Sequence, residues 1–147
     1  MNRVETVVSC FKQGFSCSQA ILSTFSEQFG LDRDTARRLA AGFGGGMGRM
    51  AGTCGAVTGA FMVLGLKYGA TSAEDRQANE LTYEKVREFA ARFSERYGSS
   101  ECRELLGYDI SSPAGYQIVK DKELISTLCP NYVRDAAEIL EEMLRAE

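Results

Sequence analysis

Cysteine is the residue type in this sequence that is best suited to chemistry. The 147 residues include five cysteines and no histidine. Without an imidazole group, the sequence excludes histidine-ligated zinc or haem, a Cys–His dyad and a Ser–His–Asp triad. In a reducing compartment, the cysteines favour metal binding, thiol redox chemistry or simple burial over a disulfide framework.

Four of the five cysteines stand where a helix is predicted to begin, each beside a residue that caps or opens helices. These pairs are Ser16–Cys17, Thr53–Cys54, Ser99 or Ser100 with Cys102, and Cys129–Pro130. A helix N-terminus offers unpaired N–H groups and a positive dipole end, which lower a cysteine pKa from ~8.5. The pattern therefore predicts thiolates at these four positions. Burial of each cysteine as a small hydrophobic residue stays open as the alternative, and Cys10 lies inside a predicted helix.

A glycine-rich segment, residues 44–52, leads directly to Cys54. Its backbone N–H groups can approach an anion or a cluster sulfur, and Arg49 is its only fixed positive charge. The candidate cofactor-binding residues are Gly45, Gly46, Gly48 and Arg49. No strand precedes the segment and no GK[ST] ending follows, so neither a Rossmann nor a Walker motif is indicated. A plain, flexible connection between helices is the alternative.

Apolar residues recur at helical spacing along the whole chain, and no stretch alternates with a period of two. The sequence therefore predicts an all-α fold, a compact helical bundle of about five to seven helices in a single domain over residues 1–147. Further expected features are N-caps at Ser16 and at Asp32 or Asp34, a capping box from Thr71 to Glu74, a helix end at Gly98, a short helix over 118–128, and a last helix opening at Pro130.

The stretch that follows Cys54 is apolar nearly all round from Ala56 to Leu66. Such a stretch predicts a central helix that is buried on most of its surface. Gly55 and Gly59 lie four residues apart on one face, so a neighbouring element is expected to approach this face closely.

The charge pattern limits the class of partner. The net charge is −3, and the basic residues are scattered, which argues against nucleic-acid binding. No apolar run reaches the ~18 residues of a membrane span, and no secretory signal is present at the N-terminus. We expect a cytoplasmic protein that binds neither nucleic acid nor membrane.

Four blocks of sequence resemble one protein family. The blocks are GFSCSQAIL, AAGFGGGMGRMAGTCGAVTGAFMVLGLKYG, CRELLGYD and CPNYVRDAAEILEEML. Together they resemble the bacterial and archaeal redox-active protein family named for its C-GCAxxG-C-C cysteine pattern. The family motif matches residues 54–59, and the other signature cysteines match Cys17, Cys102 and Cys129, whereas Cys10 falls outside the set. The resemblance implies redox activity, a suspected metal or iron–sulfur centre, and an oxidoreductase or transporter-associated redox partner.

The leading hypothesis is electron transfer or redox sensing through a four-cysteine site. Cys17, Cys54, Cys102 and Cys129 would converge, either as ligands of an iron–sulfur cluster or other thiophilic metal, or as two exchanging thiol pairs. One alternative is a non-catalytic helical scaffold with buried cysteines. Another is a binding protein for a small anionic ligand, which the glycine-rich segment and Arg49 would hold within one chain or across a homodimer.

Overall fold

The computed structural model of the protein describes residues 1–145 and confirms the all-α class. Within these residues there are eight α-helices, more than the five to seven expected, because two short helices, α6 and α7, form separate elements. The helices are α1 (Arg3–Lys12), α2 (Cys17–Phe25), α3 (Arg33–Ala40), α4 (Gly55–Tyr68), α5 (Arg76–Tyr97), α6 (Cys102–Leu106), α7 (Pro113–Asp121) and α8 (Leu124–Arg145), with 3-10 turns η1 (Glu27–Phe29) and η2 (Ala41–Phe43).

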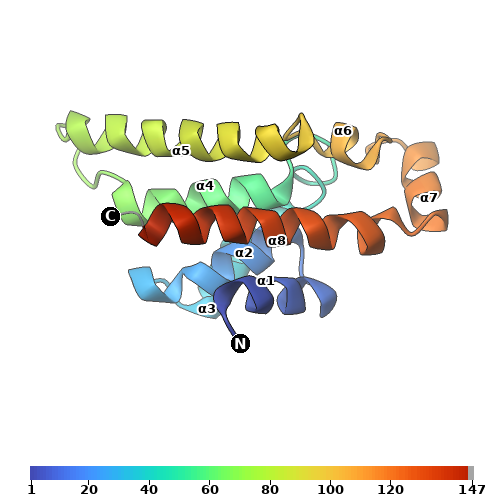
Figure 1. The fold of residues 1–147 in the computed structure, drawn as a ribbon, viewed down its shortest axis with the longest axis horizontal. Coiled ribbons are helices and arrows are strands. Elements are labelled where there is room, and N and C mark those ends of the chain that lie inside the picture. Colours follow the sequence, from blue (N-terminus) through green and yellow to red (C-terminus); the bar gives the residue numbers. More distant parts are fainter. Residues whose placement is uncertain (146–147) are drawn as a thin grey trace.

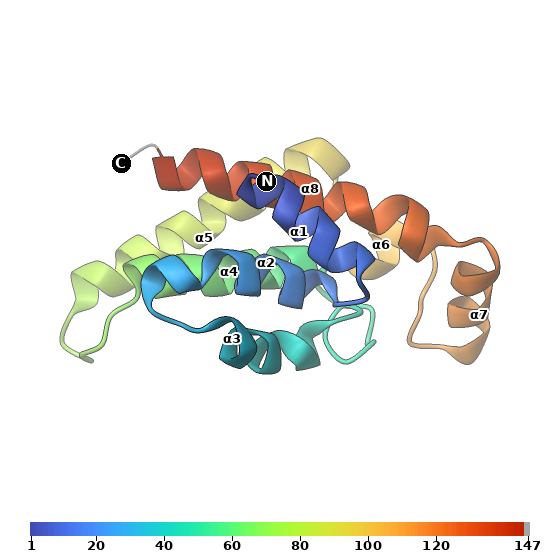
Figure 2. The same cartoon turned by 90° about the horizontal axis from the view of Figure 1, so that it is seen from below.

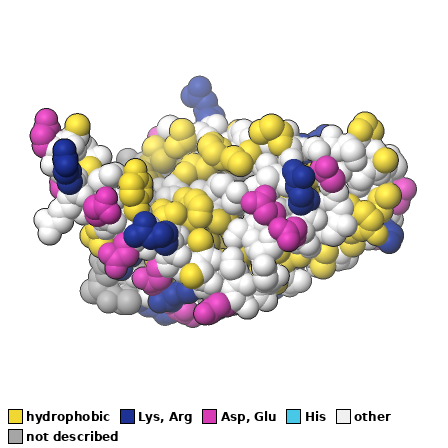
Figure 3. Space-filling view, turned by 90° about the horizontal axis from the view of Figure 1, so that it is seen from above, with side chains coloured by type: hydrophobic (Ala, Val, Ile, Leu, Met, Phe, Trp, Pro, Cys, Tyr) yellow, Lys and Arg dark blue, Asp and Glu magenta, His cyan; other side chains and the backbone are white. Residues whose placement is uncertain are grey.

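Helix α4 is the centre of the bundle, with α2 alongside it and α5 and α8 packed on its other sides (Figures 1 and 2). The core positions of α4 that carry side chains are fully buried: Ala56, Val57, Ala60, Val63 and Leu64. This agrees with the apolar run in the sequence. One side of α4 reaches the surface at Leu66, and the face of the molecule in Figure 3 shows hydrophobic side chains gathered among charged ones.

Glycine is required where α4 meets α2. A Cβ atom on Gly59 would lie 3.0 Å from the Cβ of Ile21 and 3.1 Å from the carbonyl oxygen of Ser18. A Cβ atom on Gly55 would lie 3.2 Å from the Cβ of Cys17. The close approach expected at these two glycines is therefore present, and α2 is the element that makes it.

Several helix starts agree with the sequence and others differ. Ser16 caps α2 in a capping box with Gln19, and Asp32 caps α3. The capping box expected at Thr71 is wrong, because α5 begins one turn later, where the side chain of Asp75 accepts a hydrogen bond from the Ala78 N–H. Ser72 instead donates to the Glu74 carboxylate within the preceding turn.

Thr53 does not cap α4; Cys54 itself occupies the N-cap position. The reason is a short antiparallel contact between Thr53 and Glu101. In this contact the Cys54 N–H donates to the Ser100 carbonyl over 2.8 Å, and the Cys102 N–H donates to the Gly52 carbonyl over 2.6 Å. Pairing of these two segments brings Cys54 and Cys102 together, although α4 and α5 separate them in the sequence.

The C-terminal helix begins earlier than the sequence suggests. The short helix expected over 118–128 is wrong, because α7 ends at Asp121 and α8 begins at Leu124, after Glu123 in the left-handed region (φ 54°). Cys129 and Pro130 therefore lie inside α8 and not at its start. Because proline has no N–H, the Ser126 carbonyl lacks its usual helical donor.

The glycine-rich segment is a hydrogen-bonded turn and not an open connection. Residues 45–49 all adopt left-handed φ values, between 59° and 68°. The Gly48 N–H donates to the Gly42 carbonyl, and the Gly52 N–H donates to the Gly46 carbonyl. A Cβ atom on Gly46 would lie 2.8 Å from the Cβ of Cys102, so only glycine fits there.

Replacing Gly59 with alanine tests the packing of α4 against α2. Because the added methyl group would meet Ile21 and Ser18, we expect the free energy of unfolding to fall by about 1–3 kcal/mol. Gly65→Ala is the matched control, since no heavy atom lies within 4 Å of its added Cβ. Its higher helix propensity should raise the stability by about 0.5–1 kcal/mol. Urea unfolding followed by circular dichroism measures both, and equal effects would contradict the close contact at Gly59.

Candidate functional site

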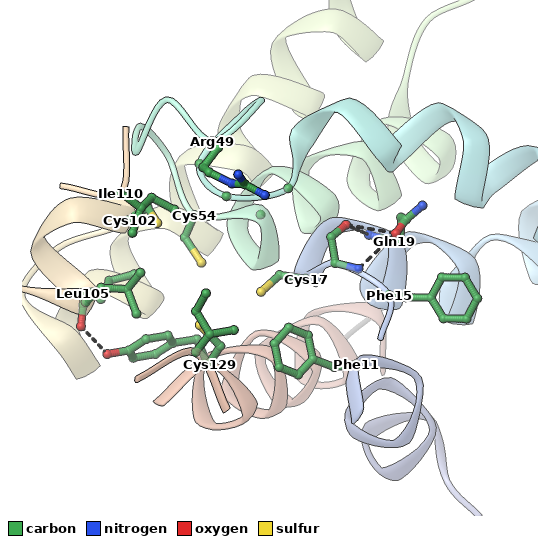
Figure 4. Close-up of a pocket in the computed structure, with 18 of the residues that line it drawn as sticks. Phe11, Phe15, Cys17, Gln19, Arg49, Cys54, Cys102, Leu105, Ile110 and Cys129 are labelled. Atoms are coloured by element: carbon green, nitrogen blue, oxygen red, sulfur yellow. Dashed lines mark hydrogen bonds between the residues drawn. The ribbon is translucent and has the colours of Figure 1, made fainter. Parts of the chain in front are cut away.

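One cavity of about 820 Å³ brings the four family cysteines together (Figure 4). Its walls come from the end of α1, the start of α2, the glycine-rich segment, the start of α4, and parts of α6, α7 and α8. Cys17, Cys54, Cys102 and Cys129 all line it, and all four are free thiols. Residues that are far apart in the sequence thus border one space.

Cys17 and Cys54 meet because two helix starts face each other. Cys17 is the first residue of α2, and Cys54 is the N-cap of α4. Gly55, which has no side chain, lets the first turn of α4 approach the backbone of Ser18 and the side chain of Cys17. Figure 4 shows the two sulfur atoms pointing toward each other across the cavity.

Cys102 and Cys129 reach the cavity from other elements. Cys102 is held by the backbone pairing with Gly52 and lies in a second hydrophobic cluster with Leu106 and Ile110. Cys129 comes from α8 and packs against both this cluster and the main core. The cavity therefore opens where the two hydrophobic clusters of the protein meet.

The pKa values of Cys17 and Cys54 are shifted in opposite directions. Hydrogen bonds to Cys129 and Cys54, together with burial, raise the pKa of Cys17 well above its ordinary value. The hydrogen bond from Cys17 lowers the pKa of Cys54, and the backbone N–H groups of Ala56 and Val57 add to this effect against the opposing effect of burial. A thiol has one proton, so Cys17 can serve only one of its two acceptors at a time.

The prediction of thiolates at all four positions is correct in direction for Cys54 and wrong for two others. The pKa of Cys17 rises, mainly through its interaction with the Cys129 and Cys54 side chains and then through burial. For Cys102 the main cause is desolvation, which disfavours a charged sulfur and raises the pKa to about 12. For Cys54 the main cause is the Cys17 thiol and not the helix dipole.

Cys10 lies apart from this site. It is 5% exposed in the main core, with its sulfur 4.0 Å from the hydroxyl oxygen of Ser23. It does not line the cavity, which agrees with its place outside the family pattern.

The predicted cofactor-binding residues also border the cavity. Gly45, Gly46, Gly48 and Arg49 all line it. Within residues 1–145, the N–H groups of Gly45 and Gly46 have no hydrogen-bond acceptor. The guanidinium of Arg49 lies over the ring of Tyr116, 4.1 Å from its centroid. The segment therefore places unpaired donors and one cation beside the thiols.

Two tyrosines of the site were not found from the sequence. Tyr132 is 7% exposed and donates its hydroxyl hydrogen to the Leu105 carbonyl over 2.6 Å. Its pKa is raised by burial and by the nearby cysteines. Its position three residues after Cys129 is a helical-spacing signal that could have revealed it. No sequence signal connects Tyr116 with the glycine-rich segment.

The donor set suits a thiophilic metal, but its arrangement does not form a ready coordination shell. Four thiols and no histidine are the chemistry of an iron–sulfur cluster or another soft metal. Within the described residues, however, no group of three or more His, Cys, Asp or Glu side chains is arranged to hold a metal ion. The residues do not fit a metal in this geometry, and we derive no step through one.

The order of the cysteines and the glycine-rich approach to Cys54 are those of a known family. A family model described as "Putative redox-active protein (C_GCAxxG_C_C)" matches residues 15–143. The chain belongs to this family. The match includes all four cysteines of the cavity and excludes Cys10.

The other comparisons add no relative to this C_GCAxxG_C_C protein. Neither the curated proteins nor the solved structures gave a match. None of the helices in the described part of the chain combines the length and hydrophobicity that crossing a membrane requires.

Replacing Cys17 with alanine tests the source of the thiolate at Cys54. Without the Cys17 donor, the pKa of Cys54 should rise, so a smaller fraction is thiolate at pH 7 and alkylation slows several-fold. The measurement is the pH dependence of iodoacetamide labelling of Cys54 in reduced, metal-free protein, read by peptide mass spectrometry.

Cys10→Ala is the matched control, because Cys10 lies outside the cavity, and it should leave the labelling profile of Cys54 unchanged. In the wild-type protein, Cys54 should react faster at pH 7 than Cys10. A Cys17→Ala profile identical to that of the wild type would show that the Cys17 thiol does not set the reactivity of Cys54.

Proposed function

We propose that this C_GCAxxG_C_C protein is a thiol–disulfide redox protein in which Cys54 is the nucleophile and Cys17 the resolving thiol. The observation that carries the proposal is that Cys17 and Cys54 lie at two facing helix starts on the wall of one cavity, with their sulfur atoms pointing toward each other, and that the Cys17 thiol lowers the pKa of Cys54. A thiolate in contact with a protonated thiol is the arrangement that dithiol oxidation requires.

The two reacting cysteines are held in place by the starts of α2 and α4. The Cys54 thiolate attacks one sulfur of a disulfide oxidant, the S–S bond of the oxidant breaks, one thiolate leaves, and a mixed disulfide forms on Cys54. The departing thiolate takes the Cys17 proton, and the Cys17 thiolate then attacks the Cys54 sulfur, which forms a Cys17–Cys54 disulfide and releases the second thiolate of the oxidant. Two electrons leave the protein in this process. The reverse reaction with a thiol restores the dithiol, so the couple can serve either electron transfer or redox sensing.

The other two cysteines have different roles in this proposal. Cys129 lines the same cavity and is the largest cause of the raised pKa of Cys17, so in this proposal it attacks the Cys17 sulfur of the disulfide, displaces the Cys54 thiolate and exchanges one pair for another. Cys102, with a pKa of about 12, stays protonated at neutral pH and does not initiate the reaction. The site thus has one reactive pair and one exchanging thiol.

Oxidation of the protein by one equivalent of diamide, followed by disulfide mapping, tests the function. We expect a Cys17–Cys54 linkage that dithiothreitol reverses. It should be absent from the Cys17→Ser and Cys54→Ser variants and present in the Cys10→Ser control. Because the two thiols face each other in one cavity, the yield should exceed half of the protein.

Two outcomes would contradict the dithiol function. Thiols that stay reduced would favour the scaffold alternative. Stoichiometric iron and acid-labile sulfide in anaerobically purified protein would instead favour a cluster held by Cys17, Cys54, Cys102 and Cys129. Metal and sulfide analysis before oxidation therefore belongs to the same experiment.

A further inference from the structure

The reactive thiol lies inside the cavity and not on a protruding surface. Cys54 is 6% exposed and Cys102 is 8% exposed. A disulfide on the surface of a folded protein would have to enter the cavity to reach Cys54. A small molecule can enter, and about 820 Å³ is space for an organic ligand. Access to the sulfur therefore favours a small reaction partner.

The charges around the cavity are of one sign. Lys12 and Arg49 line it, and none of the described lining residues is Asp or Glu. Neither cation forms an ion pair within residues 1–145. This is notable in a chain with a net charge of −3. The local field favours an anion where the whole protein would repel one.

The apolar and polar parts of the wall are separated. Leu105, Leu106 and Ile110 provide apolar surface near Cys102. Arg49, held over Tyr116, lies on the glycine-rich segment, where the Gly45 and Gly46 N–H groups lack acceptors. Figure 4 shows Arg49 bordering the same space as the sulfurs of Cys17 and Cys54. A ligand with an anionic end and a short apolar body matches this wall.

We infer that the reaction partner of Cys54 is a small organic disulfide that carries carboxylates, with one carboxylate bound by Arg49 and the neighbouring N–H groups. The inference rests on the proposed thiol–disulfide function and names its substrate class.

The reaction balances with this partner alone. The Cys54 thiolate attacks one sulfur of RS–SR, the S–S bond breaks, and one RS⁻ leaves and takes the Cys17 proton. The Cys17 thiolate then attacks the Cys54 sulfur and displaces the second RS⁻. Both cysteine sulfurs are oxidised, and the disulfide is reduced to one RSH and one RS⁻.

Three disulfides of similar size and different charge test the inference. They are dithiodipropionate (dianionic), bis(2-hydroxyethyl) disulfide (neutral) and cystamine (dicationic). The rate of Cys17–Cys54 formation with each is divided by the rate of the same disulfide with 2-mercaptoethanol, which removes its intrinsic reactivity. We expect the normalised rate to fall in the order dianion, neutral, dication, and the differences to shrink as salt is raised.

Arg49→Gln identifies the group that selects the anion. This substitution should lower the rate of Cys17–Cys54 formation with dithiodipropionate by about tenfold, which is the effect of losing one charge-assisted hydrogen bond. It should slow the neutral disulfide by less than about twofold. Arg87→Gln, the same charge change on an exposed residue of α5 outside the cavity, should leave both rates unchanged.

A measurement on the wild-type protein does not depend on a variant. Suberate, the carbon analogue of dithiodipropionate, should protect Cys54 from iodoacetamide, whereas 1,8-octanediol should not. Equal normalised rates for the three disulfides, absence of protection by suberate, or faster oxidation by oxidised thioredoxin would each overturn the inference. The proposed function would stand in those cases if the neutral disulfide still produced the Cys17–Cys54 linkage. If no disulfide produced it, both would fail.

Discussion

The close approach of α4 to α2 is the constraint on which the site depends. A Cβ atom on Gly55 or Gly59 would lie only 3.0 Å from an atom of Ser18 or Ile21, a tight contact that α2 could meet only by shifting. Because the helices meet at this short separation, their first turns lie against each other and Cys17 lies beside Cys54. A side chain at Gly55 would enter the space between the two cysteines. The glycines of the family motif therefore shape the cysteine-lined cavity through packing, although they carry no reactive group.

The surroundings of each thiol give the cysteines of the cavity different pKa values. All four line one cavity, yet the pKa of Cys102 rises to about 12 while that of Cys54 falls. The difference lies in the neighbours of each sulfur: the Cys17 thiol is the largest cause of the lowered pKa of Cys54, and the start of α4 adds to it, whereas burial is the largest cause for Cys102. A buried sulfur without such neighbours stays protonated. Proximity of cysteines alone would not make one of them a nucleophile at neutral pH.

Local sequence signals predicted several helix ends correctly, and they failed where contacts between distant segments determine the end of a helix. Ser16, Asp32 and Gly98 mark helix ends by their own side-chain or backbone chemistry, and they do so in the structure. Thr53 was expected to cap α4, but it pairs instead with Glu101, which follows α4 and α5 in the sequence. The four cysteines of the family pattern line one cavity in the structure. Which of these cysteines has a lowered pKa depends on tertiary contacts that cannot be predicted from their spacing in the sequence.

Pro130 shows how burial overrides a local preference. A proline inside a helix costs about 3 kcal/mol, so the sequence favours a helix that starts at it. In the structure α8 begins at Leu124, because Leu124, Ile125 and Leu128 pack against the second hydrophobic cluster and offset that cost. This early start carries Cys129 to the cavity wall within a helix.

The backbone of the glycine-rich segment also contains a residue in an unfavourable conformation. Arg49 keeps a left-handed φ of 62°, which costs a non-glycine residue roughly 1–2 kcal/mol. Glycine at this position would remove that cost but also the only cation of the segment. Met47 and Ala51 adopt the same left-handed region without a charge, with φ values of 68° and 60°, so the strain belongs to the turn as a whole and the turn places the charge of Arg49 beside the cavity.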